Sequence, residues 1–104
     1  MQSLTIKQIL HGAAELGQSL TVEGWVRTRR DSKAGVSFLA VSDGSCFSSL
    51  QVVVPDTLEN YVSEVLSITT GFSIRVSGQM VESQGKNQSV EMLADSVVIV
   101  GSVE

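Results

Sequence analysis

A cluster of basic residues is the part of this sequence best suited to binding chemistry. Four of the seven lysines and arginines lie between positions 27 and 33, in RTRRDSK, where Asp31 is the one acid. Guanidinium and ammonium groups bind phosphate oxygens. The whole chain carries a net charge of −4 and has a pI near 4.8, and an acidic body with one cationic strip favours docking of a polyanion at that strip over nonspecific coating. The alternative is a solvated charged loop that keeps an edge strand soluble.

The other components of a site for single-stranded nucleic acid are present on neighbouring segments. Such sites combine cations that follow the phosphates, aromatic faces on which bases stack, and polar groups that contact base edges. Phe38 follows the basic run, Gln51 lies between two apolar residues, and Glu91 takes a similar position near the end. The charges come from Arg27, Arg29, Arg30 and Lys33. Phe38 and Trp25 could instead be core aromatics, with Gln51 and Glu91 solvated.

Catalytic and metal-binding patterns are missing from the sequence. There is no Gly-x-Ser-x-Gly nucleophile elbow, and the glycines of GQMVESQGK are too widely spaced for a phosphate-binding P-loop. The acids show neither a calcium-loop spacing nor a close pair. A lone Cys46 and a lone His11 cannot supply a zinc cage, a redox pair or an internal disulfide. We therefore expect no cofactor and no enzymatic activity in this chain.

Size and composition predict one globular domain spanning residues 1–104. The chain has a mass of 11.1 kDa, 42% hydrophobic residues and a mean hydropathy of +0.21, which is too apolar for a disordered protein and long enough for one core. No apolar run approaches the roughly 20 residues that a membrane helix needs. The N-terminus MQSLTIKQ does not resemble a signal peptide. We expect a cytoplasmic protein with no membrane partner.

Alternating apolar and polar residues predict five strands. The predicted strands cover residues 20–30, 36–43, 47–54, 72–83 and 89–100. Lys33-Ala34-Gly35, Asp43-Gly44 and the polar segment 83–88 are expected to be turns, and the third strand should stop before Pro55.

Two segments have a helical spacing of apolar residues. A short helix is predicted over residues 3–10, with Gly12 as its stop. The second predicted helix has about ten residues, with Asp56 or Thr57 as its N-cap and Gly71 after its end. Its apolar face would consist of Leu58, Tyr61, Val62, Val65 and Leu66.

Five strands with a helix between the third and fourth are typical of the OB-fold, a small all-β Greek-key barrel that binds oligonucleotides. An open five-stranded sandwich is the competing architecture. In the barrel the helix would close one end, and the surface of the first three strands would remain available for binding.

The sequence also resembles a known family. VEGWVRTRRDSKAGVSFLAVSDGSCFSSLQVVV at 22–54, and TTGFSIRVSGQMVESQGKNQSVEMLADSVVIVG at 69–101, resemble the N-terminal anticodon-binding OB domain of bacterial asparaginyl-tRNA synthetases. The aspartyl and lysyl relatives share only the G-x-V-x-x-R-R kernel and the downstream phenylalanine and glutamine. The resemblance covers the chain from about residue 4 to its end and implies binding of the anticodon loop of asparagine tRNA.

Specific roles follow from this resemblance. Phe38 matches the phenylalanine that stacks on the central anticodon uridine. Gln51 and Glu91 match residues that contact anticodon bases, and Arg30 matches an arginine that supports the same loop. The class II catalytic motifs are absent, so ATP and magnesium would bind outside this chain, in a full-length homodimeric enzyme. A freestanding OB module for single-stranded nucleic acid or a protein partner, or the equivalent domain of an aspartyl-tRNA synthetase, are the alternatives.

Overall fold

A computed structural model describes residues 2–3, 5–13, 15–33, 35–82 and 90–102. The chain begins with a two-residue strand and a short helix. The elements, in order, are β1 (Gln2–Ser3), α1 (Ile6–Gln8), a π-helical turn (Ile9–Ala13), β2 (Ser19–Ser32), β3 (Val36–Ser42), β4 (Leu50–Pro55), a 3-10 helix (Val65–Ser67), β5 (Ser73–Glu82) and β6 (Val90–Gly101). The five strands β2 to β6 match the five that hydrophobic alternation predicts.

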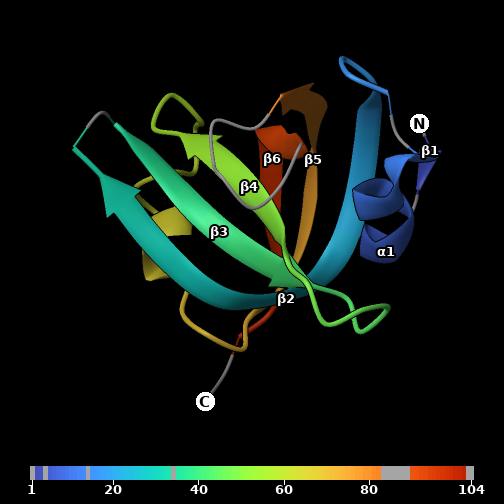
Figure 1. The fold of residues 1–104 in the computed structure, drawn as a ribbon. Coiled ribbons are helices and arrows are strands. Elements are labelled where there is room, and N and C mark those ends of the chain that lie inside the picture. The colour runs from blue at the N-terminus through green and yellow to red at the C-terminus, as the bar shows by residue number, and fades with distance from the viewer. Residues whose placement is uncertain (1, 4, 14, 34, 83–89, 103–104) are drawn as a thin grey trace.

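These five strands form a closed barrel. Strand β2 pairs with β3, β3 with β4, β4 with β6, β6 with β5, and β5 again with β2. Figure 1 shows how β2 makes this closure possible, because it is long and curves around the barrel. Its first half pairs with β5 and its second half with β3. The closed barrel confirms the OB-fold and excludes the open sandwich.

The apolar side chains that alternate along each strand fill the barrel. Leu20, Val22 and Val26 of β2 are buried, while Glu23 and Trp25 between them are exposed. The same alternation holds in β3, β4 and β5, as expected for a sheet with one buried face. Phe38 and Trp25 do not belong to the buried core, so neither is a core aromatic.

The N-terminal helical segment starts later than predicted and packs on the barrel. Thr5 caps α1 by a reciprocal pair of hydrogen bonds with Gln8, a capping box that satisfies two amides at the helix start. Ile6 and Ile9 are fully or almost fully buried in the core cluster. Gly12 ends the helical backbone with a φ of 91°, a conformation that glycine adopts without steric cost.

The helix of about ten residues predicted between the third and fourth strands is wrong in its length and type. The described chain between β4 and β5 consists of turns and the 3-10 helix Val65–Ser67. The segment contains Ser, Thr, Asn and β-branched residues, which are poor helix formers, and tertiary packing uses only part of the apolar stripe. Tyr61 and Val65 are buried, whereas Val62 is 78% exposed.

The loop between β3 and β4 also differs from the prediction. Phe47, expected to begin the third strand, lies in this loop and is fully exposed, and β4 starts at Leu50 and includes Pro55. The Asp43–Gly44 turn is confirmed, with Gly44 at a φ of 81°. Burial raises the pKa of Asp43, but hydrogen bonds from Ser45 and from the Ile6 amide outweigh it and hold this pKa below its usual value. The predicted turn at 83–88 lies outside the described residues.

Strands β5 and β6 approach each other closely at Gly78. A Cβ atom added there would collide with the backbone carbonyl oxygen of Leu93 and lie 2.8 Å from the Ala94 Cα. We expect Gly78→Ala to destabilise the fold by about 1–3 kcal/mol, because the strands must separate. Chemical denaturation measures this change. Gly101→Ala is the matched control, since its Cβ would lie 3.9 Å from the Ser73 side chain; equal effects from both variants would contradict the prediction.

Candidate nucleic-acid interface

Two rows of side chains cross the outer surface of β2, β3, β4 and β6. Because neighbouring residues in register project from the same side of a sheet, the strand pairing defines each row. The first row is Arg30, Phe38, Val53 and Leu93, and the second is Thr28, Ala40, Gln51 and Glu91. We call these residues the outer face. Four of the seven residues predicted from the sequence lie on it.

A cation and an aromatic ring meet in the first row. The Arg30 guanidinium carbon lies 5.4 Å from the centroid of the Phe38 ring, within the range of a cation–π interaction. Phe38 is partly exposed and Arg30 is exposed. Val53 and Leu93 continue the row with apolar side chains, Leu93 being 41% exposed. Aromatic rings and guanidinium planes are both surfaces on which nucleobases stack.

The second row contains a polar pair. The Gln51 side-chain amide donates a 2.6 Å hydrogen bond from Nε2 to Oε2 of Glu91. Glu91 is only 6% exposed, although it projects from the outer side of β6. This contact holds both groups in a defined orientation next to Phe38. Amide and carboxylate groups placed in this way can pair with the edge of a base.

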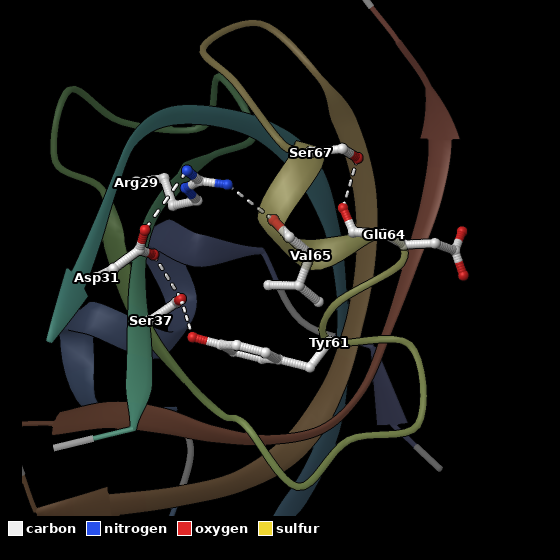
Figure 2. A network of polar contacts seen from close by, with 7 residues as sticks. All are labelled: Arg29, Asp31, Ser37, Tyr61, Glu64, Val65 and Ser67. Carbon is white, nitrogen blue, oxygen red and sulfur yellow. Dashed lines mark hydrogen bonds and ion pairs between the residues drawn. The ribbon is translucent and has the colours of Figure 1, made fainter. Parts of the chain in front are cut away.

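The basic run is divided between the two sides of β2. Arg30 projects outward, whereas Arg29 and Asp31 project toward the end of the barrel, where Figure 2 shows them with Ser37 and Tyr61. Arg29 donates a 3.2 Å hydrogen bond from Nη1 to the Val65 carbonyl oxygen and lies 3.5 Å from the Asp31 carboxylate. The structure therefore does not bring Arg29 together with Phe38.

These contacts tie the β2–β3 hairpin to the segment between β4 and β5. The Ser37 hydroxyl donates to Asp31 Oδ1 at 2.7 Å and also lies 2.7 Å from the Tyr61 hydroxyl. Ser37 is fully buried and Tyr61 nearly so, whereas the Asp31 side chain is 45% exposed, so only the Ser37–Tyr61 part of the network is shielded from water. The network fixes the hairpin that carries Arg30 and Phe38. Sequence reasoning missed it, although a serine among buried strand residues, opposite an aspartate, is a recognisable signal.

Arg27 and Lys33 flank the outer face. Arg27 lies at an irregularity in the β2–β3 register between Val26 and Thr28. Its Nη1 donates a 2.9 Å hydrogen bond to the Phe47 carbonyl oxygen. Lys33 follows β2 and is exposed. Both cations are exposed at the surface, at opposite ends of the second half of β2.

Neither a cluster of metal-ligating side chains nor a membrane-spanning helix is present among the described residues. Within the described ranges, no three or more histidine, cysteine, aspartate or glutamate side chains are grouped so that they could hold a metal ion. In the same part of the chain, no helix combines the length and apolar character required to cross a bilayer.

Comparison with protein families and known sequences gives a consistent result. Residues 20–100 match the tRNA anticodon model, described as an OB-fold nucleic acid binding domain. The chain is 51% identical over 104 residues to an asparagine–tRNA ligase of Colwellia psychrerythraea and 53% identical over 104 residues to one of Yersinia pestis. All of this chain is covered, but it spans 22% of the length of each relative.

A solved structure has the same fold. An asparaginyl-tRNA synthetase from Pyrococcus horikoshii, complexed with asparaginyl-adenylate, superposes with a TM-score of 0.82 at 16% identity. The match covers 99% of this chain and 23% of that one.

Proposed function

Because this chain belongs to the tRNA anticodon family of OB-fold nucleic acid binding domains, we propose that it binds the anticodon loop of asparagine tRNA. The observation that carries the proposal is the outer face, which places a cation, an aromatic ring and a polar pair on adjacent strands. The similarity to asparagine–tRNA ligases over the whole chain supports the choice of tRNA.

The central base of the anticodon stacks on Phe38 in this proposal, and Gln51 and Glu91 read its edge. A uridine offers an N3–H donor and two carbonyl acceptors. An ionised Glu91 is an acceptor only, whereas the Gln51 amide can donate or accept. Cytosine carries an acceptor at N3, which would face a carboxylate without a hydrogen between them. With Glu91 accepting from N3–H, as proposed here, the polar pair favours uridine over cytosine.

The basic residues have different roles in this proposal. Arg30, Arg27 and Lys33 are exposed and would contact backbone phosphates, which position an RNA without reading its sequence. Arg29 is held by Val65 and Asp31. Its contribution would be to hold the hairpin in place, with its charge adding to the local field.

We further propose that this domain functions in a longer, homodimeric asparagine–tRNA ligase in the cytoplasm. The chain spans about a fifth of the length of its relatives, so ligation, with its requirement for ATP and magnesium, is assigned to the remainder of such a protein. No cofactor is proposed for the 104 residues themselves.

The test is a comparison of two RNAs. Binding of asparagine tRNA is measured beside the same tRNA altered only at its central anticodon base, from uridine to cytosine, at low and at moderate salt. We expect a clear preference for the tRNA with uridine at both salt concentrations. Equal, salt-sensitive binding of the two RNAs would indicate a generic cationic surface and would contradict anticodon readout.

The contribution of Arg30 to phosphate binding has a measurable signature. For single strands the logarithm of affinity falls with the logarithm of salt by about 0.7 per neutralised phosphate. Arg30→Gln should therefore flatten this slope by up to about 0.7 and weaken binding of both RNAs. Arg75→Gln is the matched control, because it removes the same charge from an exposed pair with Glu23 on β2 and β5. Equal slopes for both variants would show that only net charge matters.

A further inference from the structure

A second aromatic site lies beside the outer face. A groove of about 520 Å³ is lined by Trp25, Arg27, Gly44, Ser45, Cys46 and Phe47, among others. Trp25 is 44% exposed and Phe47 is fully exposed. Exposed apolar side chains that share one groove mark a candidate interaction surface, and here two aromatic side chains share a groove with a guanidinium.

The loop between β3 and β4 is organised around the Trp25 ring. A Cβ atom on Gly44 would lie 3.3 Å from the ring edge of Trp25, so the glycine lets the backbone approach the indole. The loop is held at two further points, by the hydrogen bond from Arg27 to the Phe47 carbonyl oxygen and by those from Ser45 and Ile6 to Asp43. These contacts keep three side chains at the same groove, those of Trp25, Arg27 and Phe47.

Charge distinguishes two hollows that Trp25 lines. None of the described residues that line the Arg27 groove is acidic. Trp25 also lines a separate hollow, together with Glu23, Asp43, Ser73 and Val100. A polyanion would therefore be attracted to the groove that contains Arg27 and repelled from the hollow that contains Glu23 and Asp43.

The groove continues the outer face along β2. Trp25 pairs with Ser42, and further along the same two strands Arg30 pairs with Phe38. Five residues of extended strand cover roughly 16 Å. A nucleotide bound at Trp25 would thus lie beyond the one stacked on Phe38, on the same surface.

We propose that this groove binds one further nucleotide of the same RNA, outside the three anticodon bases. The base lies against Trp25 and Phe47, and its phosphate lies at Arg27, which has further N–H donors besides the one used by the loop. Aromatic faces next to a cation are the combination by which proteins hold single strands. This inference rests on the proposed function, because it assigns a second subsite to the same ligand.

The experiment uses Trp25 as its own reporter. Trp25 is the only tryptophan in the sequence, and a base stacked on an indole quenches its emission. Titration with asparagine tRNA should quench this emission with the same midpoint as binding measured by filter retention. Phe47→Ala should weaken binding about fivefold or more, the lower limit for loss of a base stack, while the preference for a central uridine stays unchanged. Val62→Ala, which alters a residue 78% exposed in the segment between β4 and β5, should have no effect.

Abasic substitution along the tRNA loop then identifies the nucleotide. At one position outside the anticodon, removal of the base should abolish the difference in RNA affinity between the unaltered chain and Phe47→Ala. Uridine preference without quenching and without an effect of Phe47→Ala would overturn the second subsite and leave the anticodon proposal intact; the groove would then be available to a protein partner. Absence of RNA binding by the unaltered chain would overturn both proposals.

Discussion

Phe38→Ala is expected to weaken binding of asparagine tRNA by roughly one to two orders of magnitude, because a base stacked on an aromatic side chain contributes about 1–3 kcal/mol. The variant should also lose most of its preference for a central uridine, since the base would no longer be held against Gln51 and Glu91. Fluorescence anisotropy with the two tRNAs measures both quantities.

Two controls separate stacking from other effects of this substitution. Phe38→Leu keeps an apolar side chain but removes the aromatic face, so it should resemble Phe38→Ala in affinity. Phe38 lies outside the buried core, so neither variant should lower the melting temperature by more than a few degrees. Retention of affinity in both variants would contradict a stacking role.

Leu39→Ala is expected to lower the stability of the fold while leaving the affinity for asparagine tRNA almost unchanged, the reverse of Phe38→Ala. Leu39 neighbours Phe38 in β3 but points into the barrel and is fully buried. Removal of its side chain should cost about 2–5 kcal/mol and lower Tm by roughly 10 °C or more. Well below that Tm, the affinity for asparagine tRNA should change less than twofold, because the outer face is unaltered.

Thermal unfolding monitored by circular dichroism tests this expectation. Leu16→Ala is the matched control, because Leu16 is 59% exposed and its truncation should change Tm by only a few degrees. A Leu39→Ala variant with unchanged Tm would contradict the assignment of Leu39 to the core. Substitution of Phe38 should therefore reduce RNA binding without lowering stability, and substitution of the adjacent Leu39 should lower stability without reducing RNA binding.

Period-two alternation predicts where the five barrel strands lie, since one face of each strand is buried, although β4 begins at Leu50 rather than at Phe47. In β2, for example, burial alternates strictly from Leu20 to Glu23. The same kind of argument was wrong for the helix near residues 58–66. An apolar spacing of three and four residues fits a helix, but Val62 points to solvent and Tyr61 reaches across to Ser37. Here tertiary contacts outweigh a weak local preference.

The sequence predicts candidate residues for the interface but not how they are arranged. Arg30 and Phe38 lie eight positions apart, and one tight turn brings them together. Gln51 and Glu91 are 40 residues apart, and only closure of the barrel reveals their contact. The separation of Arg29 from Arg30 depends on strand alternation, and the position of Arg27 depends on an irregularity in the β2–β3 pairing. The sequence contains no local signal for that irregularity.

The double use of β2 has a consequence for how the chain folds as it is synthesised. The first half of β2 cannot complete its pairing until β5 has been synthesised. The Thr21 and Ser77 side chains, for example, form a hydrogen bond although they lie 56 positions apart. A nascent chain that ends after β4 would therefore have two open edges, one along this half of β2 and one along β4. Open edges favour pairing with other chains, and contacts this distant in sequence form slowly. Emergence of the β5–β6 hairpin, which pairs with both edges, is thus the event that commits the nascent chain to the barrel.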